Sequence, residues 1–280
     1  LRKRSWRKVI CCYALAAFFL CPSGVSAQEN RHYEIGVLAD RGKDRAVEQW
    51  KPLADYLSEH FDPANFSVVP LTYDELYAAV HNRTVDFIVT DPGMSIELMY
   101  FYEIQNIASL KRLLRGKDYK FYGGVIFTRA DRDDIKRLKD IKGKRFAAVH
   151  ESSFGGWLLP AREFQRLGLN IQKIFKSLIF LGTQDDVVWA VLEGKVDAGS
   201  VRSGILEIME DDDLISLRDI KVIHGREHNM LADFFHSTDL YPEWSIAKLD
   251  HVSDAAAQRI TALLYDLPSG HPALEAAGCA

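Results

Sequence analysis

The feature that most constrains the fold is a regular alternation of strand-like and helix-like segments that begins at residue 33. Short apolar runs predict strands, and the stretches between them carry apolar side chains at helical spacing. The first predicted elements are strands at 33–38, 67–71 and 85–89 and helices at 47–57 and 73–81. This strand–helix–strand order predicts a parallel sheet with right-handed crossovers, because each helix must carry the chain back to the end of the sheet where the next strand starts.

The pattern continues and predicts a second α/β unit. The further predicted elements are strands at 107–114, 121–128, 145–149, 178–181 and 196–201, helices at 157–167 and 184–192, late strands at 221–223 and 230–235, and a helix at 253–264. Gly168 and Gly194 follow two of these helices, and glycine commonly ends a helix. We therefore expect two α/β lobes, with the late strands returning the chain to the first lobe.

The first 27 residues have the pattern of a secretory signal peptide. Basic residues crowd the start, Val9 to Leu20 is almost entirely apolar, and Val25-Ser26-Ala27 offers small residues for cleavage after Ala27. The apolar run is shorter than the roughly 20 residues that a membrane helix needs. We therefore expect residues 1–27 to be removed and the mature chain to work in the periplasm.

The composition bears on the class of partner. The chain has a net charge of −4 and 26% charged residues. Nucleic-acid-binding proteins gather basic residues on one face, so no nucleic acid is expected as a partner. The net charge does not exclude a small anion, because the field of a site is set by the residues around it.

The segment 152–156 predicts a helix start that can hold an anion. Ser152, Ser153, Gly155 and Gly156 follow an apolar strand and precede a helix. The backbone N–H groups at such a start have no partner within the helix and lie at the positive end of its dipole. The alternative is a plain helix cap, for which serine is a preferred residue. Phe154 is either an apolar wall of the site or a packed core residue.

Further candidate ligand residues lie in loops that follow the other predicted strands. Open α/β sheets bind ligands at the carboxyl ends of their parallel strands. The candidates outside the helix start are Arg41, Thr90, Asp91, Tyr122, Thr183, Arg202 and Ser203. Arg202 offers two parallel donors to an oxyanion, with a surface arginine paired to Glu207 as the alternative. Asp91 can instead cap the turn at Pro92.

The sequence offers little for an enzyme. His224-Gly225-Arg226-Glu227-His228 matches the H-x-x-E-H spelling of a zinc protease, which needs both histidines on one helical face. Gly225 follows a predicted strand and favours a turn. The phosphate-binding and nucleophile-elbow motifs are absent. We therefore expect a binding protein with no catalytic residues, no metal and no cofactor, and keep a metal-dependent enzyme as a remote alternative.

The order of four segments resembles a known family. They read WKPLADYLS, TYDELYAAVHNRTVDFIVTDPG, DIKGKRFAAVHESSFGGWLLPAREFQRLG and AVLEGKVDAGSVRSGILE. Together they resemble the phosphonate-binding type of periplasmic solute-binding protein across Tyr33–Glu207. Within it, the stretches 153–157 and 201–204 are more similar to the periplasmic input domains of tetrathionate-type sensor histidine kinases. The resemblance implies a type II bilobal fold with a hinge and a cleft between the lobes.

The resemblance also implies boundaries and a function. It implies a first lobe at 28–127, a second at 128–228, and a return to the first at 229–280, with the domain running on past Ala280. It implies a small anionic ligand that closes the lobes, and either a membrane kinase module or an ABC permease as the partner. Phosphonate binders carry hydroxyls where this chain has Phe154 and Gly155, so we expect a site that is not tuned to phosphonate.

Overall fold

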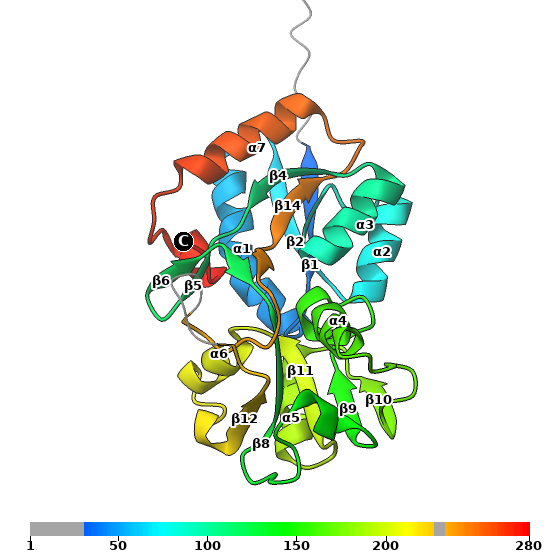
Figure 1. Cartoon of the computed structure of the whole chain (residues 1–280). Helices are drawn as coiled ribbons and strands as arrows, with labels where there is room; N and C mark the ends of the chain where they lie inside the picture. Colours follow the sequence, from blue (N-terminus) through cyan, green and yellow to red (C-terminus); the bar gives the residue numbers. More distant parts are fainter. Residues whose placement is uncertain (1–30, 227–232) are drawn as a thin grey trace, which may run out of the picture.

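The computed structural model describes residues 31–226 and 233–280, which form two lobes that lie one above the other in Figure 1. Each lobe is built on a five-stranded sheet. The predicted α/β bilobal fold is confirmed. The predicted signal peptide at 1–27 lies outside the described residues. Within the described ranges, no helix is both long enough and apolar enough to cross a bilayer.

The first lobe is the upper one in Figure 1, and its sheet has the order β2-β1-β3-β14-β4. Its strands are β1 (His32–Leu38), β2 (Asn65–Leu71), β3 (Phe87–Thr90), β4 (Gln105–Ser109) and β14 (Ser245–Lys248). Its helices are α1 (Lys43–His60), α2 (Tyr73–Asn82), α3 (Pro92–Tyr102), α7 (Asp254–Asp266) and α8 (Pro272–Ala276). Strand β1 runs parallel to β2 and β3, and β14 is antiparallel to β3.

Sequence pattern explains these first-lobe helices directly. Helix α1 buries Trp50, Leu53 and Leu57, which recur every three or four residues and form one apolar stripe. Helix α2 begins with a reciprocal cap, in which the Thr72 hydroxyl accepts from the Glu75 N–H and the Glu75 carboxylate accepts from the Thr72 N–H. The packing of α1 and the start of α2 therefore follow from local sequence.

The second lobe has the sheet order β10-β9-β11-β8-β12. Its strands are β8 (Gly124–Arg129), β9 (Arg145–Ala148), β10 (Ser177–Phe180), β11 (Ala198–Arg202) and β12 (Ile220–Ile223). Its helical segments are η1 (Leu138–Ile141), the π-turn η2 (Phe154–Leu158), α4 (Leu159–Arg166), α5 (Gln184–Leu192), α6 (Ile205–Asp211) and η3 (Leu217–Asp219). Strands β9, β10 and β11 are parallel, so their carboxyl ends share one edge of the sheet.

Two segments carry the chain between the lobes. β7 (Phe121–Tyr122) leads into the second lobe, β13 (Tyr241–Pro242) leads back, and the two pair antiparallel. A hairpin of β5 (Arg112–Leu114) and β6 (Lys117–Tyr119) precedes the first crossing. Strand β8 already pairs in the second sheet from Gly124, and β14 is again in the first. The lobe boundaries at residues 127 and 228 stay predictions.

The structure corrects several of the predicted elements. The strand predicted at 121–128 is two strands, β7 and β8, in separate sheets. The late strand predicted at 221–223 is β12, which pairs with β8 in the second lobe and does not return the chain to the first. The strand predicted at 107–114 is two strands, β4 and β5, in separate sheets. Residues 233–235 of the strand predicted at 230–235 belong to no strand, and the rest of it lies outside the described residues. The helix predicted to begin at Trp157 begins earlier, as a π-turn from Phe154.

Candidate ligand site between the lobes

The helix start at 152–156 forms a cap that faces the first lobe. The Ser153 hydroxyl accepts a hydrogen bond from the Gly156 N–H at 3.2 Å, and the Ser153 carbonyl accepts from Trp157 and Leu158, both at 2.9 Å. The Phe154 N–H donates across the cleft to Asp91 Oδ2 at 3.4 Å. The Asp91 carboxylate of the first lobe therefore lies where the sequence predicts an anion. The alternative, a plain cap by Ser153, is present as well.

Both glycines of this turn allow close approach. A Cβ on Gly155 would lie 2.9 Å from Arg202 Cβ and 2.9 Å from Tyr122 Cε2. A Cβ on Gly156 would lie 2.5 Å from Val149 Cγ2. Such distances are shorter than van der Waals contact, so the turn can sit against the crossing segment only because glycine occupies these positions.

Phe154 packs at the junction of the lobes. Its ring makes edge contacts with Tyr122, at 6.3 Å between centroids, and with Tyr241, at 5.2 Å. These tyrosines lie on β7 and β13, the two crossings. Phe154 therefore joins the helix start to both crossing segments.

Three further contacts hold the lobes together in this structure. The Tyr73 hydroxyl of α2 donates to Ser153 Oγ at 2.9 Å, and the Tyr73 ring stacks on His150 at 4.6 Å between centroids. The Gln184 N–H at the start of α5 donates to the Asp40 carbonyl at 2.8 Å. These bonds join the carboxyl ends of strands in one lobe to those in the other, so the structure is a closed arrangement.

Arg41 provides an ionic connection between the lobes. Its guanidinium donates to both carboxylate oxygens of Asp185, at 2.7 and 2.9 Å, and approaches Asp212 at 3.4 Å. The Arg41 side chain is only 5% exposed. Arg45 reaches the same Asp212 at 2.8 Å. The predicted ligand contact of Arg41 stays a prediction, because the structure shows its donors facing carboxylates of α5 and α6.

Arg202 lies at the centre of the interface, at the end of β11. The residue is 4% exposed, so the alternative of a surface arginine is wrong. Its Nη2 donates to Glu243 Oε1 at 2.6 Å. The guanidinium also lies over the ring of Tyr122, at 4.6 Å, and near that of Trp244, at 5.5 Å from the centroids. Its positive charge is therefore matched by a buried carboxylate and two aromatic faces.

Several buried polar atoms in this region have no hydrogen-bond partner within the described part of the chain. They are the donors Arg202 Nε, Tyr122 OH and Trp244 Nε1 and the oxygen Asp40 Oδ2. A buried polar group without a partner costs about 1–3 kcal/mol, and native proteins rarely keep several together. Arg202 Nε and the donors of the two aromatic side chains that pack on its guanidinium therefore lack an acceptor, and a ligand with acceptor oxygens would satisfy them.

Burial dominates the electrostatics of the carboxyl groups near Arg202. It raises the pKa of Asp91 to about 6, against the lowering effect of hydrogen bonds from Met94, Phe154 and Gly93. Burial also raises the pKa of Asp40, and the charges of Arg202, Arg112 and Arg41 oppose that shift.

The same burial raises the pKa of Tyr73 and of Tyr122 well above the ordinary tyrosine value. Both hydroxyls therefore remain neutral donors over the physiological pH range.

The structure assigns structural contacts to the other candidates. The Thr90 hydroxyl donates to Met94 Sδ at 3.1 Å, and the Thr183 hydroxyl caps α5 by accepting from the Asp186 N–H at 3.2 Å. Ser203 Oγ accepts from the Gly123 N–H at 2.8 Å, beside the first crossing. The Ser152 N–H donates to His150 Nδ1 at 3.1 Å. Ligand contacts of these four residues stay predictions.

Sequence reasoning missed four residues at this interface between the lobes. They are Asp40, Tyr73, Glu243 and Trp244. Asp40 lies in the same strand-end loop as the candidate Arg41. Tyr73 follows β2, whose end carries none of the candidate residues. Glu243 and Trp244 lie on the returning crossing, and no local pattern marks them.

The H-x-x-E-H segment is only partly described. His224 has a left-handed φ of 56° after β12, so the segment begins as a turn, as Gly225 predicted. Glu227 and His228 lie outside the described residues. Among those that are described, no group of three or more potential metal ligands occurs.

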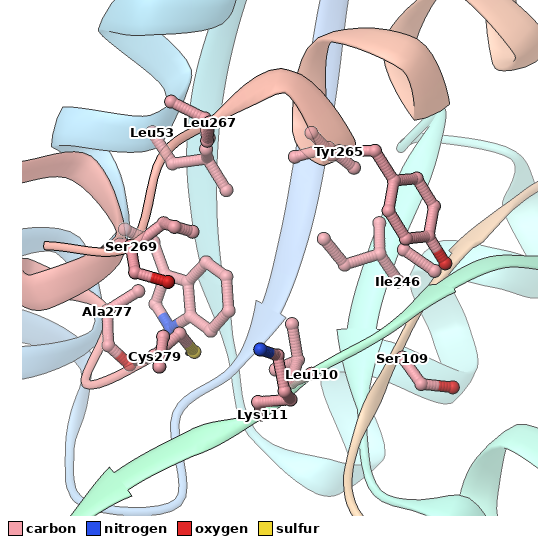
Figure 2. A pocket seen from close by; sticks show the side chains of 15 residues that line it. Leu53, Ser109, Leu110, Lys111, Ile246, Tyr265, Leu267, Ser269, Ala277 and Cys279 are labelled. Carbon is pink, nitrogen blue, oxygen red and sulfur yellow. Dashed lines mark hydrogen bonds between the residues drawn. The ribbon is translucent and has the colours of Figure 1, made fainter. Parts of the chain in front are cut away.

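A separate cavity of about 180 Å³ lies in the first lobe (Figure 2). Its labelled walls include Leu53 of α1, Ile246 of β14, Tyr265 of α7 and Cys279 near the end of the chain. None of the predicted ligand residues lines it. The candidate anion site and this apolar cavity are therefore distinct places in the molecule.

Comparisons with known proteins agree with the fold. Residues 35–280 match the family model of the periplasmic substrate-binding protein of phosphonate ABC transporters. The chain is 34% identical to the tetrathionate sensor histidine kinase TtrS of Salmonella typhimurium over 239 residues, which are 85% of this chain and 40% of that protein. The chain thus spans well under half the length of this relative.

Two solved structures share the architecture. One is PhnD1 from Prochlorococcus marinus in complex with methylphosphonate, with a TM-score of 0.69 and 16% identity over 88% of this chain and 89% of that one. The other is a binding protein component of an ABC phosphonate transporter from Pseudomonas aeruginosa, with a TM-score of 0.70 and 16% identity over 90% and 80%. The chain belongs to the phosphonate-binding family of periplasmic substrate-binding proteins.

Proposed function

We propose that this chain is the periplasmic input domain of a sensor histidine kinase and binds a small oxyanion by closure of its lobes. The observation that carries the proposal is the set of three buried donors, on Arg202, Tyr122 and Trp244, that have no acceptor within the described residues. The likeness to a tetrathionate sensor kinase supports the sensory role. The segment itself is proposed to be non-enzymatic.

Closure explains how binding produces a signal. A ligand shifts a conformational equilibrium only by its difference in affinity for the two states. Arg202 belongs to the second sheet, and Tyr122 and Trp244 lie beside the two crossings. An anion held by all three therefore favours the arrangement in which Arg202 packs against both crossings. A membrane kinase module that follows the domain would receive this change in lobe position.

The site favours an oxyanion group with a single charge, such as each sulfonate end of tetrathionate, over a doubly charged phosphonate head group. Arg202 shares its charge with Glu243 at 2.6 Å, so little net positive charge is left for the ligand. Phe154 and Gly155 also supply no hydroxyl to a phosphonate head group. Each lost hydrogen bond to a charged partner is worth about 1.5–3 kcal/mol.

The direct test is a thermal-shift and calorimetry panel of tetrathionate, thiosulfate, sulfate, phosphate, phosphite and methylphosphonate. Tyr122→Phe removes a donor that has no partner and should leave the stability of the ligand-free protein unchanged. Trp244→Phe also removes such a donor, but its smaller ring leaves a gap at a buried position and should lower the free energy of unfolding. Each should weaken anion binding about tenfold or more, since a bond to a charged partner is lost. Tyr33→Phe, a buried tyrosine of the first-lobe core, is the matched control.

Two results would defeat the proposal. In the first, no anion of the panel raises the melting temperature. In the second, an anion binds but its affinity is unchanged in Tyr122→Phe, in Trp244→Phe and in their combination.

A free-standing transporter subunit is the second candidate function. The description of the family and the two solved relatives favour it. The test is the DNA sequence that follows the codon for Ala280. A membrane span and kinase core there support the sensor, and a stop codon with neighbouring permease and ATPase genes supports the transporter.

The proposed location is the periplasm, reached through cleavage after Ala27. N-terminal sequencing of the exported protein tests this point. A mature chain that begins at Gln28 supports it, and an uncleaved exported chain contradicts it.

A further inference from the structure

Three carboxyl groups lie buried at the interface around Arg202, and one of them, Glu243, already pairs with its guanidinium. Arg202 is paired with Glu243, and two more carboxyls, Asp40 and Asp91, are buried at the same interface, with 9% and 3% of their surfaces exposed. An anion that enters this site meets those carboxylates as like charges. Like charges brought together in a poorly solvated site favour protonation of one of them.

Asp91 makes one hydrogen bond within the first lobe and one that crosses to the second lobe. Its Oδ1 accepts from the Met94 N–H at the start of α3, and its Oδ2 accepts from the Phe154 N–H at the start of η2. The second bond joins the lobes, so it exists only when they are closed. The other ionisable groups that face Asp91 are Asp40 and the hydroxyls of Tyr73, Tyr77 and Tyr122, and none of them is a cation.

Asp40 is the second carboxyl of the site, at the end of β1. Its Oδ2 is buried without a hydrogen-bond partner. Arg202, Arg112 and Arg41 exert a positive field on it, and Asp185 a negative one. Each of these arginines also faces another acceptor: Arg202 binds Glu243, Arg112 binds the Ala277 carbonyl, and Arg41 binds Asp185.

From this arrangement we propose that lobe closure takes up protons on Asp40 and Asp91, so that the site is an anion receptor whose affinity rises as its surroundings become acidic. The inference rests on the proposed function and adds its regulation. In the open protein both carboxyls would face water and ionise as ordinary aspartates. In the closed protein they are buried beside the incoming anion, and the protonated form is favoured.

The direction of the pH effect follows from linkage. The pKa of Asp91 is about 6 in the closed structure, against 3.8 for an ordinary aspartate. The closed state therefore binds more protons than the open state between these values, and acid favours closure. Each carboxyl that takes up a proton contributes up to about a tenfold change in the closure equilibrium per pH unit.

The first arm of the test uses the ligand-free protein. Small-angle X-ray scattering from about pH 7.5 to about pH 5 should show a falling radius of gyration, because this range spans the raised pKa of Asp91. Asp40→Asn with Asp91→Asn should be compact at every pH, because asparagine mimics the neutral carboxyl. Asparagine is also a good helix cap, so α3 keeps its start. Circular dichroism of this double variant checks the fold.

Two control variants isolate the proposed groups. Asp133→Asn changes an exposed carboxyl of the second lobe and should leave the pH response unchanged. Asp74→Asn removes the carboxylate that lies 3.5 Å from His150 across the cleft, the other titratable pair at this edge. The proposal is overturned if the radius does not change with pH. It is equally overturned if Asp74→Asn abolishes the change while Asp40→Asn with Asp91→Asn keeps it.

The second arm measures affinity for sulfate and tetrathionate, which do not titrate over this pH range. Wild-type affinity should rise about tenfold as the pH falls through the raised pKa of Asp91, and the double asparagine variant should bind tightly throughout. Binding without pH dependence overturns the proton linkage and leaves the proposed function standing. Compaction in acid with no anion bound at any pH contradicts the proposed function instead.

Discussion

Arg202 Nη2 and Glu243 Oε1 lie 2.6 Å apart, and both side chains are buried, with 5% and 3% of their surfaces exposed. The pair joins the last residue of β11 in the second lobe to the segment that returns the chain to the first. It holds the guanidinium over the faces of the Tyr122 and Trp244 rings. The charge that an anion would meet is therefore set by this pair rather than by Arg202 alone.

Glu243→Gln should lower the stability of the protein and raise its affinity for anions. It leaves Arg202 buried with only a neutral partner, and breaking a buried pair costs about 3–5 kcal/mol of the free energy of unfolding, less where a hydrogen bond survives. The freed positive charge should strengthen anion binding. Urea unfolding and calorimetry with sulfate measure the two effects. A variant that binds sulfate more weakly than wild type contradicts the proposed balance of charge.

Gly155→Ala should block the closed site. The new Cβ would lie 2.9 Å from Arg202 Cβ and from Tyr122 Cε2, so the turn must move away from the first crossing. Overpacking of this kind costs about 1–3 kcal/mol. Anion affinity should fall at least tenfold. Gly225→Ala, whose new Cβ would lie 3.4 Å from its nearest neighbour, is the control and should behave as wild type.

Arg41→Ala should weaken closure without disturbing either lobe. The guanidinium pairs with Asp185 and Asp212 of the other lobe. Its loss should raise the radius of gyration of the ligand-free protein and lower anion affinity about threefold to tenfold, in keeping with a partly buried pair of about 1 kcal/mol. Arg83→Ala is the control, because Arg83 pairs with Asp250 inside the first lobe. If Arg41→Ala and Arg83→Ala change the radius of gyration and the anion affinity equally, Arg41 does not stabilise the closed lobes.

Cys279 should resist alkylation in the native protein. The residue is 3% exposed, and burial raises the pKa of its thiol to about 11, so little thiolate exists near neutral pH. Iodoacetamide should label this cysteine only after unfolding, as mass spectrometry of the C-terminal peptide can show. Rapid labelling of the native protein would mean that the cavity in Figure 2 opens freely to solvent.

The fold could be predicted where residue periodicity matches a regular element. Helix α1 and the strands β1 and β3 follow their apolar patterns closely. Helix α3 could not be found in this way, because it is apolar on nearly every side and Tyr100 and Phe101 are exposed. The short strand β14 is defined by its neighbours β3 and β4, which lie far away in the sequence.

Some residues of the candidate site are also marked by local sequence, whereas others reach it only through tertiary contacts. Ser153 and Arg202 were predicted because a helix start and a strand end mark them locally. Asp91 was predicted as a cap, and it caps α3, but its reach to Phe154 depends on how the lobes meet. Glu243 and Trp244 approach Arg202 only through the second crossing, and tertiary contacts of this kind leave no trace in local sequence.

The most direct test of the anion site is a crystal structure of the protein grown with saturating tetrathionate, with the ligand located by the anomalous signal of its sulfur atoms. Oxygen atoms of the anion should lie within hydrogen-bond distance of Arg202 Nε, Tyr122 OH and Trp244 Nε1, with the lobes closed as in Figure 1. An anion bound elsewhere, or closed lobes in which these three donors face no ligand oxygen, would contradict the proposed site.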